Sequence, residues 1–138
     1  YNLPAPKDDN TYDFSFSGIK SAVINLVHNE KQRKNEINKE DLAASFQETA
    51  VGILVKKTIR AIKEYNVKQL LVAGGVSANS YLREKLSKAC KELGVELLMP
   101  ALKYCTDNAA MIGAAAYYEF LNKNFTDFSF DPEPGLDL

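Results

Sequence analysis

The sequence predicts a helix-rich α/β fold with two short parallel strands. Two short apolar runs, QLLVA and VELLM, have the length of strands and lie between stretches with helical spacing of their apolar residues. From residue 40 onward, the expected order is helix, strand, helix, strand, helix. Strands connected through a helix favour parallel pairing, with helices covering the faces of the sheet. The chain of 138 residues is long enough for about one domain with a hydrophobic core.

The composition narrows the class of protein. Apolar residues make up 46% of the chain. The formal net charge is -1, so the chain lacks the overall basic charge that would indicate a nucleic-acid binder. No apolar run approaches the roughly 18 residues of a membrane-spanning helix, and we expect no signal peptide. The two cysteines fit neither a disulfide framework nor a zinc-site spacing. We therefore expect a cytoplasmic protein without a membrane partner. The first residue is not Met, which is typical of a fragment or a processed product.

The N-terminal third predicts one helix between irregular segments. Residues 1–12 contain two prolines and lead into DFSFSG, after which apolar residues recur at helical spacing from Ile19 to Val27. The charged stretch HNEKQRKNEINKED predicts a linker. Asn38, followed by Asp41 three residues later, is typical of the start of a helix.

The remaining elements follow in order. A long helix is predicted at about residues 40–65, and then QLLVA forms an apolar strand of the kind covered on both faces. The next helix is expected to end at Gly94, which fits the usual position of a C-terminal glycine cap. VELLM is the second strand and ends at Pro100, and TDN opens a last helix before an irregular tail.

Gly74, Gly75 and Asn79 form the first candidate site. In open parallel sheets, ligands bind beyond the carboxyl ends of the strands, where the two glycines lie. Glycine lets the backbone approach a ligand, and the start of the following helix offers free N–H groups. The alternative is a tight turn followed by an ordinary Asn or Ser helix cap.

Asp107 is the second candidate. It comes after the second strand at the start of the last helix, where a carboxylate can cap the helix or bind a metal ion. Small residues follow it, including Gly113, and they allow another backbone or a ligand to come close. Glycine inside a helix costs about 1 kcal/mol relative to Ala, so high helix propensity alone does not explain this run.

Other polar groups have simpler interpretations. A cationic strip on the long helix is expected to be a solvated face, with contact to nucleic-acid phosphates as the alternative; it comprises Lys56, Lys57, Arg60 and Lys63. The single histidine, His28, is expected at a helix end on the surface. The chain has no HExxH zinc-peptidase motif and no Ser-His or Cys-His pair that the pattern brings together.

Three motifs together resemble the C-terminal portion of the TsaD (YgjD/Gcp) family: DFSFSGIKSA, LLVAGGVSAN with YLREKL, and KYCTDNAAMIGAAA. The resemblance implies the C-terminal part of an actin-like, Hsp70-type ATPase lobe with a ribonuclease-H-like core. Residues 1–38 would be an N-terminal extension and helical insert with the DFSFSG motif. Residues 39–125 would belong to the lobe, and residues 126–138 would form a tail.

The family resemblance also implies a function. The whole enzyme would transfer a threonylcarbamoyl group from threonylcarbamoyl-adenylate to N6 of adenosine at position thirty-seven of tRNAs that read codons starting with A. Gly74, Gly75 and Asn79 would bind the nucleotide, either this donor or ATP. Asp107 would bind one divalent metal ion, iron or alternatively zinc, whose other ligands are two histidines outside this chain. No general base is implied.

The resemblance implies tRNA, the TsaB and TsaE proteins and the N-terminal lobe of the same protein as partners. The chain alone is expected to be inactive, and either to self-associate or to rearrange its N-terminal segment over the uncovered apolar face of its incomplete sheet. Two other functions remain open: another actin-fold enzyme such as a sugar or acid kinase, and a non-catalytic nucleotide-binding or interaction module. The historical name of the family, O-sialoglycoprotein endopeptidase, finds no support in the residues present.

Overall fold

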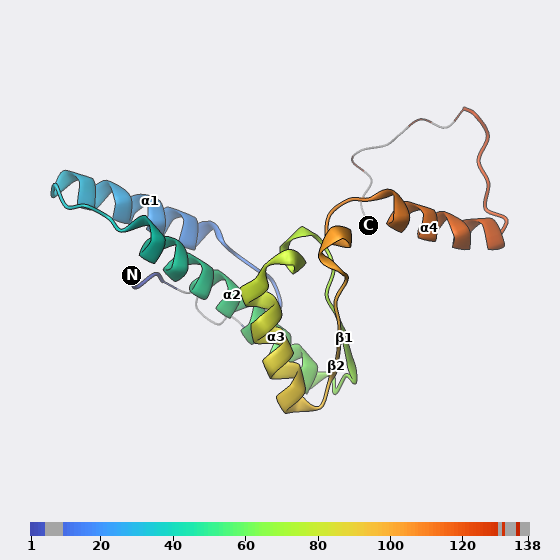
Figure 1. Ribbon diagram of the computed structural model, residues 1–138, viewed down its shortest axis with the longest axis horizontal. Coiled ribbons are helices and arrows are strands. Elements are labelled where there is room, and N and C mark those ends of the chain that lie inside the picture. The colour runs from blue at the N-terminus through green and yellow to red at the C-terminus, as the bar shows by residue number, and fades with distance from the viewer. Residues whose placement is uncertain (5–9, 130, 132–134, 136–138) are drawn as a thin grey trace.

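The computed structural model describes residues 1–4, 10–129, 131 and 135 (Figure 1). The described elements are α1 (Ser17–Gln32), α2 (Lys39–Glu64), β1 (Gln69–Leu71), α3 (Ser80–Leu93), β2 (Glu96–Leu98) and α4 (Ala109–Leu121). Two short 3-10 helices, η1 (Gly75–Ala78) and η2 (Leu102–Tyr104), follow the two strands. The order from α2 onward confirms the predicted helix, strand, helix, strand, helix.

The two strands pair in parallel, as predicted. Their register places Gln69 opposite Glu96 and Leu71 opposite Leu98. Helix α3 connects them, so the three elements form one β-α-β unit (Figure 1). Because the strands are parallel, their carboxyl ends lie at the same edge, and the loops that follow them leave the sheet together.

Helices α2 and α3 cover one face of the strand pair. Val51 of α2 and Leu82 and Leu86 of α3 form a buried cluster, against which Leu70 and Leu97 of the two strands pack. The opposite face is open within the described part of the chain, where the side chain of Leu71 is 69% exposed. The expectation that the first strand is covered on both faces is therefore wrong for these residues, because helices pack against it from one side only.

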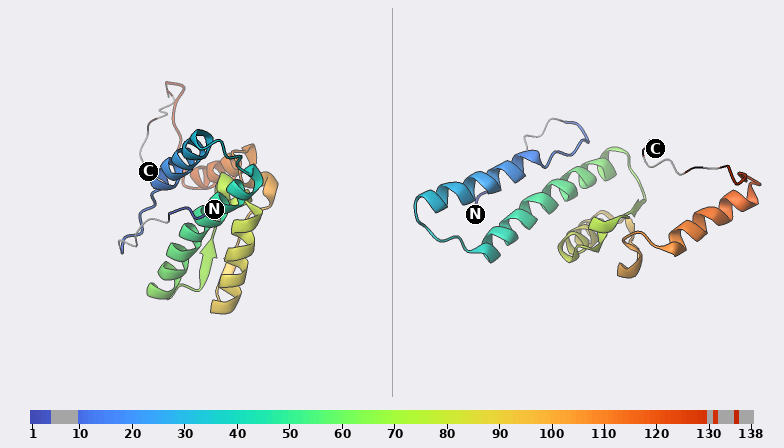
Figure 2. Two further views of the ribbon diagram at one scale, coloured as in Figure 1. Left: turned by 90° about the vertical axis from the view of Figure 1, so that its left-hand side faces the viewer. Right: turned by 90° about the horizontal axis from the view of Figure 1, so that it is seen from above.

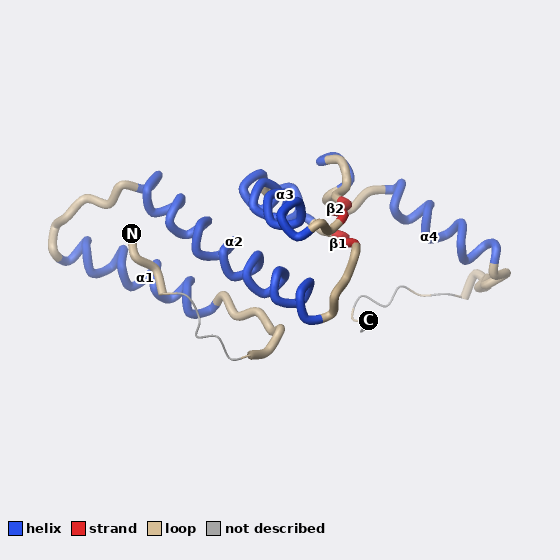
Figure 3. Tube along the Cα trace, turned by 90° about the horizontal axis from the view of Figure 1, so that it is seen from below, coloured by secondary structure: helices blue, strands red, loops and turns tan. Residues whose placement is uncertain are grey.

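Helices α1 and α2 form an antiparallel pair joined by residues 33–38 (Figures 2 and 3). Ile19 of α1 is fully buried against Leu42 and Ile53 of α2. Helix α1 runs on to Gln32, so the linker predicted from residue 28 is shorter than expected. The residues concerned include Glu, Lys and Gln, which are good helix formers and sustain a solvated helix without apolar spacing.

Helix α2 buries two different faces. Leu42 and Ile53 face α1, whereas Val51 faces α3. The apolar residues of α2 therefore form two stripes, one against each neighbouring helix. The N-terminal cap is confirmed, because the side chain of Asn38 accepts a hydrogen bond from the Asp41 N–H at 3.0 Å.

Helix α4 projects away from the rest of the molecule (Figures 1 and 2). None of its residues is buried. Within the described residues, no atom beyond the adjoining backbone of α4 and the chain neighbours lies within 4 Å of where a side chain at Gly113 would begin, so the close neighbour expected for the small residues is not seen there. In the described part of the chain, each helix is either too short or too polar to span a lipid bilayer.

Candidate functional site

Two loops at the carboxyl ends of the strands form the candidate site. The first loop runs from Gly74 to Asn79, and the second from Pro100 to Asp107. They approach closely, because a Cβ atom added to Gly75 would lie 3.9 Å from the Cγ2 atom of Thr106. The parallel pairing of β1 and β2 thus brings together residues that are about thirty positions apart in the sequence.

Glycine is required at position 74 by the backbone. Gly74 has a φ of 87° and a ψ of 168°, a conformation that is essentially restricted to glycine. It turns the chain out of β1 and into η1, which Gly75 begins. The φ of Gly75 is not positive, and the space beside it would accept a methyl group at an ordinary contact distance. The backbone conformation therefore explains why residue 74 is glycine. It does not require glycine at position 75, where the missing side chain can serve the approach of a ligand.

Gly74, Gly75 and Asp107 line one cavity of about 550 Å³. Tyr104, Thr106 and Met111 contribute to its walls. The structure therefore brings three of the four predicted site residues to one place.

Asp107 does not cap helix α4. The cap is Asn108, whose side-chain oxygen accepts a hydrogen bond from the Met111 N–H at 3.0 Å. Capping was one of the two roles expected for Asp107, and it is wrong because α4 begins one residue later than that role would require. Asp107 is exposed at the rim of the cavity, and its carboxylate serves no capping function.

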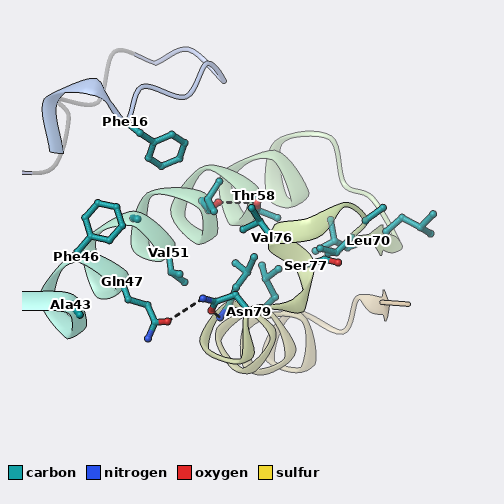
Figure 4. A pocket seen from close by; sticks show the side chains of 17 residues that line it. Phe16, Ala43, Phe46, Gln47, Val51, Thr58, Leu70, Val76, Ser77 and Asn79 are labelled. Carbon is teal, nitrogen blue, oxygen red and sulfur yellow. Dashed lines mark hydrogen bonds between the residues drawn. The ribbon is translucent and has the colours of Figure 1, made fainter. Parts of the chain in front are cut away.

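Asn79 does not line this cavity but a neighbouring groove on the other side of the end of β1. Its side-chain oxygen accepts a hydrogen bond from the Leu82 N–H at 2.9 Å, which confirms it as the cap of α3. Its amide nitrogen donates to Oε1 of Gln47 on α2 at 3.0 Å (Figure 4). Both polar atoms of Asn79 therefore bond within the chain.

The groove that Asn79 lines has a volume of about 730 Å³. It lies between α2, α3 and the end of β1, and Phe16 and Phe46 stand at one end of it (Figure 4). This groove shares Leu71, Val72 and Ala73 with the cavity of the two glycines. The two spaces are thus neighbours separated by the last residues of the strand.

Sequence reasoning missed Arg83. This half-buried residue of α3 donates hydrogen bonds from its guanidinium group to both loops of the site. A signal was present, because Arg83 lies four residues after the cap Asn79 and therefore one helical turn above it. Gln47 carried no signal, because its contact with Asn79 depends on the packing of α2 against α3.

The described residues contain no group of three or more His, Cys, Asp or Glu side chains that could hold a metal ion. Asp107 would therefore be a single ligand within this part of the chain. His28 is exposed on α1 and bonds Gln32 at 3.0 Å, as expected for a surface histidine. Both cysteines are free and buried, and burial raises the pKa of the Cys90 thiol.

Part of the cationic strip holds the N-terminal segment on α2. The ammonium group of Lys57 donates to the backbone oxygens of Thr11 at 3.1 Å and Asp13 at 2.5 Å. The guanidinium group of Arg60 lies 4.4 Å from the ring centre of Tyr12 and donates to the Thr11 oxygen. These two cations therefore contact the N-terminal segment, and their part of the helix surface is not fully solvated as expected.

Comparison with known proteins shows that the chain is similar to one protein family. A family model described as TsaD, tRNA N6-adenosine threonylcarbamoyltransferase, matches residues 1–114. Curated relatives bearing the name tRNA N6-adenosine threonylcarbamoyltransferase include proteins from Enterococcus faecalis, 57% identical over 134 residues, and Staphylococcus saprophyticus, 58% identical over 131 residues. A third, from Limosilactobacillus fermentum, is 56% identical over 134 residues. These alignments cover 96%, 95% and 96% of this chain, but only 38%, 38% and 39% of the relatives.

Proposed function

This chain belongs to the TsaD family, tRNA N6-adenosine threonylcarbamoyltransferase, and we propose that it supplies part of the active site of such an enzyme. The reaction is transfer of a threonylcarbamoyl group from threonylcarbamoyl-adenylate to N6 of adenosine at position thirty-seven of tRNA. The observation that carries the proposal is the cavity at the carboxyl ends of two parallel strands, into which Gly74, Gly75 and Asp107 open. The chain spans 38% of the length of its relative from Enterococcus faecalis, so the whole enzyme is the unit of activity.

The adenylate part of the donor is proposed to bind beside Gly74 and Gly75. No side chain projects from either residue, so a nucleotide can approach the backbone directly. The carboxyl ends of parallel strands are the usual ligand site in open α/β sheets, which supports this placement. The β-α-β unit is consistent with the actin-like, ribonuclease-H-like lobe that we propose for the whole protein. Asn79 would then bind the nucleotide from the adjacent groove by exchanging its bond to Gln47 for one to the ligand.

A metal ion is proposed to bind Asp107. The donor chemistry fits one carboxylate ligand, because Asp107 is exposed at the cavity and Asn108 performs the capping. The remaining ligands would come from outside this chain, with two histidines as the proposed pair, which suits iron or alternatively zinc. When bound, the metal supplies Lewis-acid activation and a fixed orientation of the donor.

The transfer itself is a substitution at the carbamoyl carbon. The N6 amine of the tRNA adenosine forms a bond to this carbon while the bond to the phosphate oxygen breaks, and AMP leaves with the electron pair. The amine loses a proton, for which no described residue is assigned as base. The residues of this chain bind and orient the donor, and such positioning is a large part of catalysis in transfer reactions. The TsaB and TsaE proteins are proposed partners of the whole enzyme.

Replacing Asp107 by Asn in the full-length enzyme tests this function. The variant is expected to unfold at the wild-type temperature, because Asp107 caps no helix. It should lose bound metal and transfer activity, because an amide is a poor substitute for a carboxylate ligand. Metal analysis, thermal unfolding and a tRNA modification assay check these outcomes.

Asn108 provides the matched control one residue away. Asn108→Ala removes the cap and should cost about 0.5–2 kcal/mol of stability, while leaving metal binding intact. Full metal content and normal transfer in Asp107→Asn would refute the metal role. ATP-dependent phosphorylation of a small acceptor, without any transfer to tRNA, would instead support a kinase of the same fold.

A further inference from the structure

We propose that Arg83 is a positioning residue of this site, which holds its two loops at a fixed distance and orientation. One loop carries Gly74 and Gly75, and the other ends at Asp107. The inference rests on the function proposed above, because it concerns how the nucleotide side and the metal side of the cavity are kept in register.

The contacts of one side chain carry the proposal. Nε of Arg83 donates to the backbone oxygen of Ser77 at 2.6 Å. Nη2 donates to the backbone oxygen of Pro100 at 2.5 Å and lies 3.4 Å from the sulfur of Cys105. Ser77 belongs to η1, directly after the glycine pair, whereas Pro100 and Cys105 lie on either side of η2. A single guanidinium group therefore bridges both loops.

The bridge continues the sheet beyond the point where its backbone pairing ends. The strands are three residues long, and a bond from the Val72 N–H to the Leu98 oxygen, 3.0 Å in length, follows them. After this bond the two chains separate into their loops. Arg83 then links them from α3, whose position is fixed by the burial of Leu82 and Leu86.

Arginine has the geometry that this role requires. Its donors are held in a rigid plane, so bonds from Nε and Nη2 fix the angle between their two acceptors as well as their distance. A charged donor also makes shorter and stronger hydrogen bonds than a neutral one. Lysine offers one rotatable ammonium group on a flexible chain, so it can satisfy one carbonyl without fixing the second. Arg83→Lys therefore keeps the charge and removes the geometry.

The test uses the full-length enzyme with Arg83→Lys, and Arg60→Lys as the matched control. Arg60 also donates to a backbone oxygen of a loop, that of Thr11, but it lines neither the cavity nor the neighbouring groove. Four quantities are measured for each variant: the unfolding temperature, the affinity for AMP, the metal content and kcat/KM for transfer to tRNA.

Arg83→Lys is expected to remain folded at the assay temperature and to lose roughly ten- to hundredfold in kcat/KM, since a misplacement of about 1 Å can cost that much. AMP affinity and metal content should fall together in this one variant. By contrast, Asn79→Ser should lower the affinity for AMP but not the metal content, and Asp107→Asn should lower the metal content but not the affinity for AMP. Arg60→Lys should leave AMP affinity, metal content and kcat/KM at wild-type values.

A lower unfolding temperature in Arg83→Lys, with wild-type AMP affinity, metal content and kcat/KM, would overturn the proposal and leave Arg83 a packing residue. If Arg83→Lys does not fold, Arg83→Gln, which keeps one side-chain donor, takes its place in the same measurements. Failure of both variants to fold would also reject a specific positioning role. A wild-type enzyme that does not transfer threonylcarbamate would overturn the proposed function itself, which separates the two failures.

Discussion

At the scale of one residue, the cap of α3 and the nucleotide contact proposed for Asn79 involve different atoms of the same side chain. Its oxygen caps α3 through the Leu82 N–H, and its amide nitrogen bonds Gln47. A nucleotide can therefore take over the nitrogen while the cap remains in place. The side chain of Gln47 is exposed and belongs to another helix, so its bond is the one that can be exchanged.

Asn79→Ser in the full-length enzyme separates the two roles. Ser caps helices about as well as Asn, so the unfolding temperature should change little. Loss of one hydrogen bond to the ligand should weaken AMP binding by about 0.5–3 kcal/mol, which calorimetric titration measures. Gln47→Ala is the control, and it should leave AMP affinity unchanged or increased because the amide of Asn79 is released. Wild-type AMP affinity in Asn79→Ser would assign Asn79 to helix capping alone.

At the scale of elements, the turn that joins β1 to α3 is decided by backbone geometry at its first residue. Gly74 occupies a conformation that costs other residues about 1–3 kcal/mol, whereas Gly75 is under no such restriction. The two adjacent glycines therefore play different parts, although the sequence presents them as equivalent.

Two alanine substitutions in the full-length enzyme test this difference. Gly74→Ala should destabilise the protein by about 1–3 kcal/mol, because alanine is strained at this φ and ψ. Gly75→Ala should leave stability near the wild-type value, because the added methyl group meets Thr106 at the ordinary distance of 3.9 Å. It should nevertheless weaken AMP binding if the ligand lies against this backbone. Denaturant unfolding and AMP titration provide the measurements, and equal destabilisation by both substitutions would contradict this account.

At the scale of the whole molecule, the chain exposes much more surface than its mass requires. Its accessible surface is 11051 Å² for 15.3 kDa, whereas a compact monomer of this mass exposes about 7,100 Å². Helix α4 accounts for part of the excess, since Ile112, Tyr118 and Phe120 are each more than 60% exposed. Large apolar side chains that are exposed together on one helix are typical of an interface with another chain or another part of the same protein.

The isolated chain is therefore expected to self-associate. Light scattering should show oligomers, and a dye specific for apolar surface should bind. Phe120→Asp should reduce the association because it removes apolar area from α4, whereas the neighbouring substitution Glu119→Gln should not. A clean monomer with low dye binding would contradict this expectation, and so would equal effects of the two substitutions.

Local sequence patterns predict the order of the α-helices and the two strands correctly. Asn38, Asn79 and Gly94 mark helix ends correctly, because capping depends on hydrogen bonds within a few residues and on the left-handed conformation that glycine tolerates. The parallel pairing of β1 and β2 was also predictable from the sequence, because two neighbouring strands that are joined through a helix favour a parallel arrangement. The family was also evident from short motifs, which the family model matches over residues 1–114.

The contacts between elements of the site follow from packing and are not predicted by local sequence patterns. The shift of the last cap from Asp107 to Asn108 is one residue along the chain, yet it leaves a carboxylate at the rim of the cavity. The bridge from Arg83 to both loops and the bond from Asn79 to Gln47 depend on how α3 packs against the strands and α2. Such contacts join residues that are distant in sequence, and no local pattern encodes them. Local hydrogen bonding and spacing therefore define the helices and strands, whereas packing defines the site.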